Sequence, residues 1–123
     1  MTARNAINTV KRFTAQYGTL VSWEEFEEVE NSRGINITQK TGKMVNAKLL
    51  LMSEKWSVLK PLIETFGLSQ DYTKYLLVLP DINLKKDMVI IDNNYQKWKI
   101  GIIDTKDIAG VPIFKQINLI EVK

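Results

Sequence analysis

The hydrophobic residues at the start of the chain recur with the period of a helix. Between residues 2 and 17 apolar side chains are spaced three and four apart, which places them in one stripe. Thr2 is a suitable N-cap, and Gly18 stands where a left-handed C-cap residue is common. The opposite face is polar and basic and carries Arg4, Asn5, Asn8, Lys11, Arg12 and Gln16. We predict an amphipathic helix whose polar face meets water, as most such faces do, or else a nucleic acid or an acidic neighbour.

The period of the pattern changes at Thr19. Residues 19–23 are rich in β-branched and aromatic side chains, which favours a strand. Residues 24–30 are ambiguous, because their apolar positions fit a helical step of three and also a strand with a bulge. We favour extended structure there, followed by a turn over residues 31–34.

The next segment has the pattern of a long hairpin. Residues 35–39 alternate as a half-buried strand does, and residues 44–52 form another apolar strand. Between them lies a predicted loop tip over residues 41–43. The charged residues of this tip region are Arg33, Lys40 and Lys43. Because one small barrel cannot satisfy so long a hairpin with its own core, we interpret it as an interaction arm; the alternative is an ordinary meander loop.

Residues 53–70 form an insertion between two predicted strands. Their apolar residues recur at helical spacing and are Trp56, Leu59, Leu62, Ile63 and Phe66. Pro61 is costly in a helix interior. We expect either a short helix that starts near Pro61 or an irregular segment with one helical turn.

The C-terminal half has the clearest strand pattern. Strands are predicted over residues 74–80, 87–92, 95–103 and 112–122. Asn93 and Asn94 stand where a two-residue type I′ turn is wanted, because asparagine tolerates positive φ. Residues 104–110 form another connection.

Short strands at regular spacing with tight turns predict a mostly β protein built on a small antiparallel β-barrel. The N-terminal amphipathic helix and a long hairpin or loop insertion complete this fold. We expect a single domain over residues 1–123, with the helix over 1–18 and the barrel over 19–123, interrupted by the insertion around 53–70.

Composition narrows the chemistry. The 123 residues include no cysteine and no histidine, so thiolate catalysis, Ser-His-Asp triads and Cys- or His-ligated metals are excluded. Asp87 with Asp92, or Asp104 with Asp107, could pair for acid–base work or hold a divalent cation. Local hydrogen bonding at turns explains these residues better. We predict a non-enzymatic protein without cofactor or metal. Because the sequence has no segment of ~18 consecutive apolar residues and no pattern of a signal peptide, we expect the protein in the cytosol.

The charge of the chain is arranged in blocks. The net charge is only +3, and the residues before Glu24 include three cations and no acid. An acidic block then follows and consists of Glu24, Glu25, Glu27, Glu28 and Glu30. Such blocks suit surfaces that meet complementary surfaces on neighbouring subunits, although a solvated acidic face explains them equally well.

One strand has the ingredients of a nucleic-acid surface. Tyr95, Lys97 and Lys99 share one face by alternation, while Trp98 and its even-numbered neighbours share the other. Small barrels bind single strands through aromatic residues on a basic face. We therefore regard Lys97, Lys99 and also Lys106 as candidates for contact with DNA; lysines that protect a strand edge from aggregation are the alternative.

The C-terminal half also resembles a known family. Residues 77–80, 87–100 and 109–114 contain an acidic residue before a β run, a tight turn followed by an aromatic residue, and a closing strand after a loop of small residues. This pattern is similar to that of the small head-tail joining proteins of long-tailed bacteriophages, also called head-closure or neck proteins. The similarity covers residues 47–123 apart from the insertion. Asn93-Asn94 replaces the glycine that is common in the family's turn.

The resemblance implies a structural virion protein. It implies a homo-oligomeric ring, a hexamer or dodecamer, between portal or adaptor proteins and tail proteins, with genomic DNA passing through the lumen. It also implies assembly in the host cytoplasm and a final place in the virion neck, with no membrane partner. On this basis we expect intersubunit contacts by four residues of the acidic block with three cations: Glu24, Glu25, Glu27 and Glu28 with Arg33, Lys40 and Lys43. We also expect a lumen lined by residues 104–110 or 53–70.

Three alternatives remain open. The chain is similarly suited to a tail-completion or terminator protein of the same particle, because both use small folds of this kind. A nucleic-acid-binding barrel would bind DNA as a monomer with salt-dependent affinity. A small enzyme would need a cleft with a carboxylate or lysine of shifted pKa.

Overall fold

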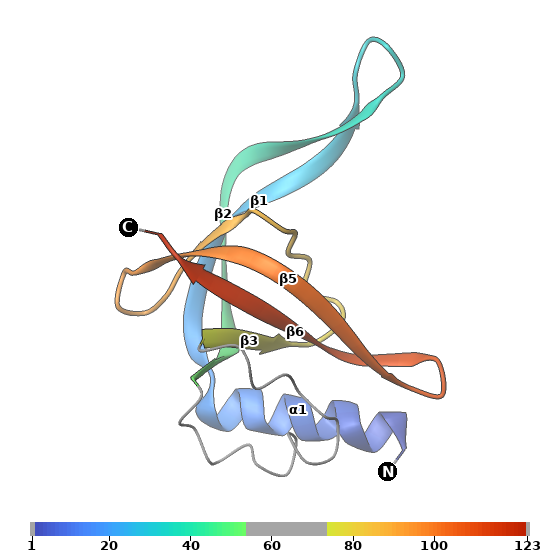
Figure 1. Ribbon diagram of the computed structural model, residues 1–123, viewed down its shortest axis with the longest axis vertical. Coiled ribbons are helices and arrows are strands. Elements are labelled where there is room, and N and C mark those ends of the chain that lie inside the picture. The colour runs from blue at the N-terminus through green and yellow to red at the C-terminus, as the bar shows by residue number, and fades with distance from the viewer. Residues whose placement is uncertain (1, 54–73, 123) are drawn as a thin grey trace.

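The computed structural model describes residues 2–53 and 74–122, and in them one helix is followed by six strands (Figure 1). These elements are α1 (Ala3–Tyr17), β1 (Thr19–Glu30), β2 (Asn36–Ser53), β3 (Lys74–Val78), β4 (Val89–Ile91), β5 (Lys97–Ile108) and β6 (Val111–Glu121). All paired strands are antiparallel, and the order β1-β2-β3-β6-β5-β4 closes into a barrel because β4 pairs back to β1. The mostly β fold, with its barrel and N-terminal helix, is therefore confirmed.

The barrel encloses one core, and its outer wall under the helix forms a second core. The run 74–78 shows why both exist: Leu76 and Val78 belong to the interior cluster, while Tyr75 and Leu77 belong to the cluster under the helix. A strand with both faces covered needs apolar residues at successive positions rather than in alternation. The continuous hydrophobic run of β3 follows from this double burial.

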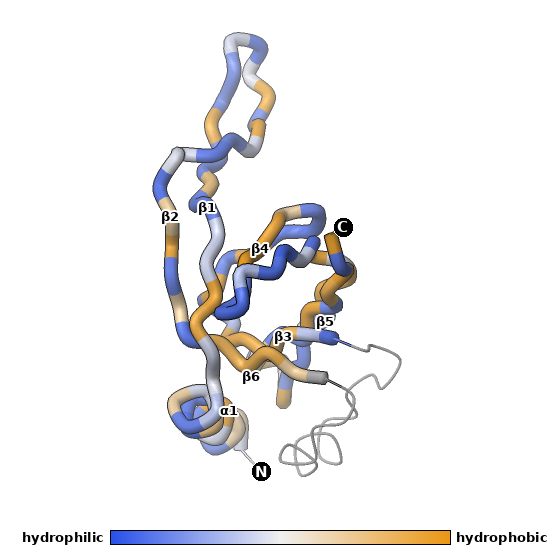
Figure 2. Tube along the Cα trace, turned by 90° about the vertical axis from the view of Figure 1, so that its left-hand side faces the viewer, coloured by the Kyte–Doolittle hydropathy of each residue, from blue (hydrophilic) through white to orange (hydrophobic). Residues whose placement is uncertain are grey.

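Helix α1 packs on the outside of the barrel, across β2 and β6 (Figures 1 and 2). Its stripe is centred on Ala6 and Val10, which are fully buried. The predicted N-cap is confirmed, because the Thr2 hydroxyl accepts a hydrogen bond from the backbone N–H of Asn5 at 3.1 Å. Among the described residues, no helix is long and apolar enough to cross a membrane.

The prediction of a left-handed C-cap at Gly18 is wrong. Gly18 is extended, with φ −66° and ψ 156°. A Cβ atom there would lie 2.4 Å from the backbone oxygen of Thr14 and 2.8 Å from Cγ of Lys48. Glycine is therefore required because the chain passes very close to its own helix end, not because of the sign of φ.

Strands β1 and β2 form the long hairpin, and it reverses at the turn predicted over residues 31–34 rather than at the tip predicted over residues 41–43. Residues 24–30 are extended with a bulge after Glu24, as favoured above, and the chain reverses at residues 31–35. Asn31 Oδ1 accepts hydrogen bonds from the backbone N–H groups of Arg33 and Ile35, and this fixes the reversal. The predicted tip at residues 41–43 lies inside β2 instead, where Gly42 has φ +82° opposite the bulge of β1.

Two further turns differ from the predictions. Asn93 and Asn94 do not have positive φ; Tyr95 does, at 62°, and the loop spans residues 92–96 because the Asp92 carboxylate organises it. The type I′ signature occurs instead at Ala109 and Gly110, with φ of 51° and 81°. Strand β5 consequently runs to Ile108, so the expected connection over 104–110 is mostly strand.

Other boundaries moved less. The strand predicted over residues 87–92 is shorter, because Asp87 has φ 73° and β4 covers only Val89–Ile91. The insertion predicted over residues 53–70, with its helix near Pro61, lies outside the described residues except for Ser53.

Candidate functional site

The most distinctive feature of the molecule is the distal part of the β1–β2 hairpin, residues 24–44, which we call the arm. In the described chain β1 pairs with β4 only at Ser22 and Trp23, and β2 pairs with β3 only from Leu50 onward. Beyond those points the two strands pair with each other alone and reach well past the barrel (Figures 1 and 2). The arm is thus a two-stranded ribbon with two open edges and two exposed faces.

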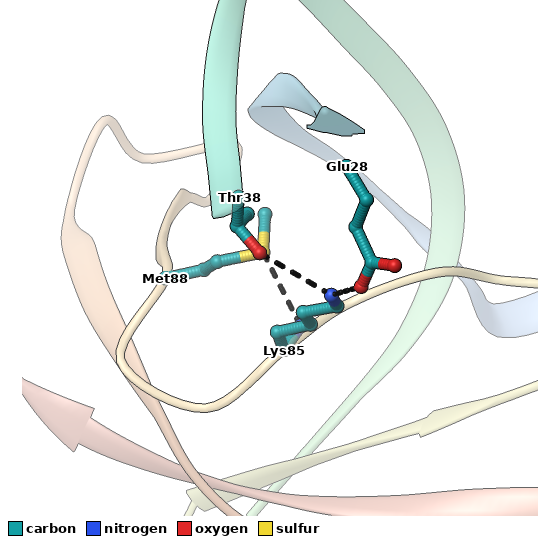
Figure 3. A network of polar contacts seen from close by, with 4 residues as sticks. All are labelled: Glu28, Thr38, Lys85 and Met88. Carbon is teal, nitrogen blue, oxygen red and sulfur yellow. Dashed lines mark hydrogen bonds and ion pairs between the residues drawn. The ribbon is translucent and has the colours of Figure 1, made fainter. Parts of the chain in front are cut away.

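The inner face of the arm touches its own barrel through Lys85. The Lys85 ammonium forms an ion pair with Glu28 and lies 3.5 Å from the hydroxyl of Thr38 (Figure 3). The same ammonium lies 4.9 Å from the centre of the Phe26 ring, within the range of a cation–π contact. Within the loop, the Lys85 backbone N–H donates to the sulfur of Met88 at 3.2 Å. One lysine therefore touches both strands of the arm.

The pKa of Glu28 reflects this contact. The hydrogen bond from Lys85 and the positive charge of Lys85 hold the pKa of Glu28 below its ordinary value. Both side chains are substantially exposed, so water and salt weaken the pair. The contact orients the arm rather than adding much to the stability of the fold.

A groove of about 320 Å³ lies in the angle between arm and barrel. Its lining includes Phe26, Thr38, Lys40, Lys85, Lys86 and Met88. One of its lining cations, Lys85, is already engaged with Glu28, and long side chains such as Lys40 and Lys86 form part of its wall. The groove therefore lacks the fixed, convergent polar groups typical of a small-molecule site.

The outer face of the arm carries exposed apolar residues. Val29 lies directly opposite Ile37, and Glu27 lies opposite Gln39 on the same face. Toward the barrel, Glu24 lies opposite Met44. By alternation, Glu24 lies on the side opposite the buried Trp23, and Glu27 on the side opposite Phe26, which contacts Lys85. The two glutamates thus share the outer side across the bulge, although Glu24 also borders the groove against the barrel. Ile37 is 42% exposed and Met44 is 49% exposed, and we call this surface the arm outer face.

The arm brings together all seven residues predicted as intersubunit contacts. Glu24 and Glu27 are on the outer face, while Glu28 and Lys40 are on the inner face. At the bulge, Glu25 accepts a hydrogen bond from the Thr41 hydroxyl at 3.4 Å. The remaining two residues are Arg33, in the turn, and Lys43, in β2. Pairing of these charges between neighbouring subunits stays a prediction.

The three predicted DNA contacts are not in one place. Lys99 lies between Val89 of β4 and Ile120 of β6, and Lys97 is two residues along the same face. Lys106 lies opposite Phe114, and at ~3.3 Å per residue it is roughly 20 Å from Lys99. The structure brings Lys97 and Lys99 together and leaves Lys106 apart.

Asp92 has a structural task. Its carboxylate accepts hydrogen bonds from the backbone N–H groups of Asn94 and Gln96 and from the indole N–H of Trp98. Burial raises its pKa, but these hydrogen bonds and the charge of Lys74 outweigh burial and leave the pKa lowered. The group is already committed to three donors, so it is poorly placed to act as a base. In residues 2–53 and 74–122 no group of three or more acidic side chains could hold a metal ion.

Two features of the arm were missed in the sequence. Lys85 lies between the strands predicted over residues 74–80 and 87–92, and no local pattern links it to Glu28, which is 57 positions away. The opposition of Val29 and Ile37 could have been found, because placing the reversal at the predicted turn after Glu30 brings these residues face to face.

Comparisons with known proteins assign no family to the chain. No protein-family model matches the sequence, and searches of curated proteins and of solved structures find no match either. Fold and site define a class by themselves: a small closed barrel from which a two-stranded arm projects.

Proposed function

We propose that the protein is a non-enzymatic structural component of the neck of a long-tailed bacteriophage. In this role it joins or closes the DNA-filled head for tail attachment, as one subunit of a ring around the DNA channel. The arm is the observation that carries the proposal. A hairpin without further strands is marginally stable in water, and open edges beside exposed apolar residues invite pairing with another chain.

A ring follows naturally from an arm that reaches away from its own barrel. Such an arm meets a different surface on the neighbour, so the contact is heterologous, and heterologous contacts generate rings when the rotation closes. The charges of the arm would then select the partner surface and its register. A hexamer or dodecamer between portal or adaptor and tail proteins fits the resemblance described above.

Shortening the arm tests this proposal. Phe26 and Lys40 are direct partners in the ladder, so residues 27–39 can be replaced by Asn-Gly, which favours a two-residue hairpin. We expect the wild-type protein to form closed rings by sedimentation and electron microscopy, and the shortened protein to remain a folded monomer. Rings that persist without the arm would contradict the proposal.

A nucleic-acid-binding barrel is the second candidate. The observation that favours it is the shared face of Lys97 and Lys99 on β5. Tyr95 is 88% exposed but lies in the loop before β5 with a positive φ, so the predicted alternation does not place it on that face. This function requires the free monomer to bind DNA with a steep dependence on salt. Fluorescence anisotropy with labelled single- and double-stranded oligonucleotides over a salt series would decide between the two candidates.

A further inference from the structure

We infer that the arm outer face of one copy docks on the outer surface of β4, β5 and β6 of a second copy. This inference rests on the proposed ring and names the two surfaces that would build it. The second surface, which we call the sheet outer face, consists of Val89, Lys97, Lys99, Ile120 and Val122.

The sheet outer face is a continuous apolar patch with two cations. Val89, Lys99 and Ile120 are direct neighbours on three adjacent strands, and such partners lie ~5 Å apart on one face. Val89 is 41% exposed and Ile120 is 45% exposed, although both belong to the barrel wall. Val122 extends the patch beside Lys97, because its backbone N–H donates to the Lys97 oxygen.

The arm outer face has the complementary composition. Val29, Ile37 and Met44 supply apolar area, and Glu24 and Glu27 supply the opposite charge. Apolar centres with opposite charges at their margins are suited to each other, whereas like charges placed face to face repel. Two arm outer faces would set glutamates against glutamates, and two sheet outer faces would set lysines against lysines. The favourable pairing is therefore arm to sheet.

Within one chain the two surfaces adjoin at the base of the arm, because Glu24 and Gln39 line the same groove as Val89. The arm leans on its own barrel through the inner face, where Lys85 holds Phe26 and Glu28. Val29 and Ile37 lie farther along the arm, next to the turn at residues 31–35, and this distal part of the outer face is not among the residues that line the groove against the barrel. A second copy is the partner that supplies a sheet outer face, and repetition of this contact adds copies in one direction.

Reversing the charges tests the inference. The sheet variant carries Lys97→Glu and Lys99→Glu, and the arm variant carries Glu24→Lys and Glu27→Lys. We expect each variant alone to self-associate roughly tenfold or more weakly than the wild type in sedimentation velocity. A 1:1 mixture of the two should recover assembly, because the lysine arm of one matches the glutamate sheet of the other. The matched control for the sheet variant is Arg4→Glu with Lys11→Glu, the same charge change on exposed α1 positions, which should assemble like the wild type.

A cross-linking experiment gives an independent readout. The chain contains no cysteine, so Ile37→Cys in one copy and Ile120→Cys in another introduce the only thiols in the mixture. A short bis-maleimide should join these two copies, and it should not join Ile120→Cys to Arg4→Cys.

The possible outcomes separate the inference from the proposed function. Wild-type rings that both charge variants also form with unchanged affinity would overturn the arm-to-sheet contact and leave the ring itself standing. A wild-type protein that stays monomeric at every concentration overturns the contact, and steeply salt-dependent DNA binding by that monomer would overturn the proposed function too. Loss in each variant with recovery in the mixture supports the inference.

Discussion

Replacing Asp92 by alanine should loosen the β4–β5 hairpin, because this one carboxylate accepts three hydrogen bonds. The donors are the backbone N–H groups of Asn94 at 2.8 Å and Gln96 at 3.0 Å and the indole Nε1 of Trp98 at 3.0 Å. Asp92 is only 7% exposed, so water replaces the lost acceptor incompletely. The hairpin closes the barrel, since β4 is the strand that pairs back to β1.

The magnitude follows from the kind of hydrogen bond lost. Hydrogen bonds to a charged acceptor contribute about 1.5–3 kcal/mol, and the two turn N–H groups can partly turn to water, so we expect Asp92→Ala to lower the free energy of unfolding by about 2–3 kcal/mol. Asp92→Asn keeps an oxygen that can accept from the two backbone N–H groups. The indole N–H of Trp98 then either faces the amide NH2 group or shares that single oxygen. The expected loss for Asp92→Asn is smaller, about 1–2 kcal/mol.

Equilibrium unfolding in urea, followed by far-UV circular dichroism, measures these losses without relying on Trp98 fluorescence. The control is Asp107→Ala, which removes an exposed carboxylate from β5 and should change stability by less than about 0.5 kcal/mol. A double-mutant cycle with Trp98→Phe isolates the indole contribution. If Asp92→Ala unfolded at the same urea concentration as Asp107→Ala, the role given to this carboxylate would be refuted.

Four further predictions concern other parts of the fold. Because the folded pKa of Asp92 lies below its unfolded value, its contribution is present above the unfolded pKa and is lost as pH falls through the folded pKa; Asp92→Asn should flatten that acid limb in urea titrations. Gly18→Ala should cost about 1–3 kcal/mol of unfolding free energy in the same assay, because its Cβ would collide with the backbone of α1. Ala109→Asn should stabilise the β5–β6 turn by about 0.5–1 kcal/mol, since asparagine tolerates the positive φ better. Lys85→Ala should speed hydrogen exchange of the arm amides with little change in global stability, because it removes the contact with Glu28 and Phe26. Lys86→Ala, the control, should leave the exchange of the arm amides unchanged.

The sequence predicts the elements whose pattern is local and repeated. The stripe of α1 and the alternation of Trp98 and Ile100 against Lys97 and Lys99 are set by neighbouring positions, and both appear as expected. The closed barrel also follows, because successive antiparallel strands protect their edges by closing on themselves.

Turns were harder to place, because side chains several positions away decide them. Asn93-Asn94 has the composition of a type I′ turn, yet the Asp92 carboxylate pulls the loop into a longer form with Tyr95 in the left-handed region. At Ala109-Gly110 the first residue is a poor former of such a turn, and the register of β5 and β6 imposes it. In the arm, the amide oxygen of Asn31 fixes the reversal. Composition alone indicates a turn both there and at Gly42, so it could not decide which of the two reverses the hairpin.

The arm follows from a mismatch of strand lengths. Strands β1 and β2 have 12 and 18 residues, while β3 and β4, which lie beside them in the barrel, have 5 and 3. The short strands set the height of the barrel, so the long ones must continue beyond it without further partners. A ribbon exposed on both faces buries little apolar surface of its own, and the contact through Lys85 is too open to water to compensate. A small barrel by itself hosts many unrelated functions, so the physical reason to propose an assembly role lies in this unsupported length of strand and in the exposed apolar residues and carboxylates along it.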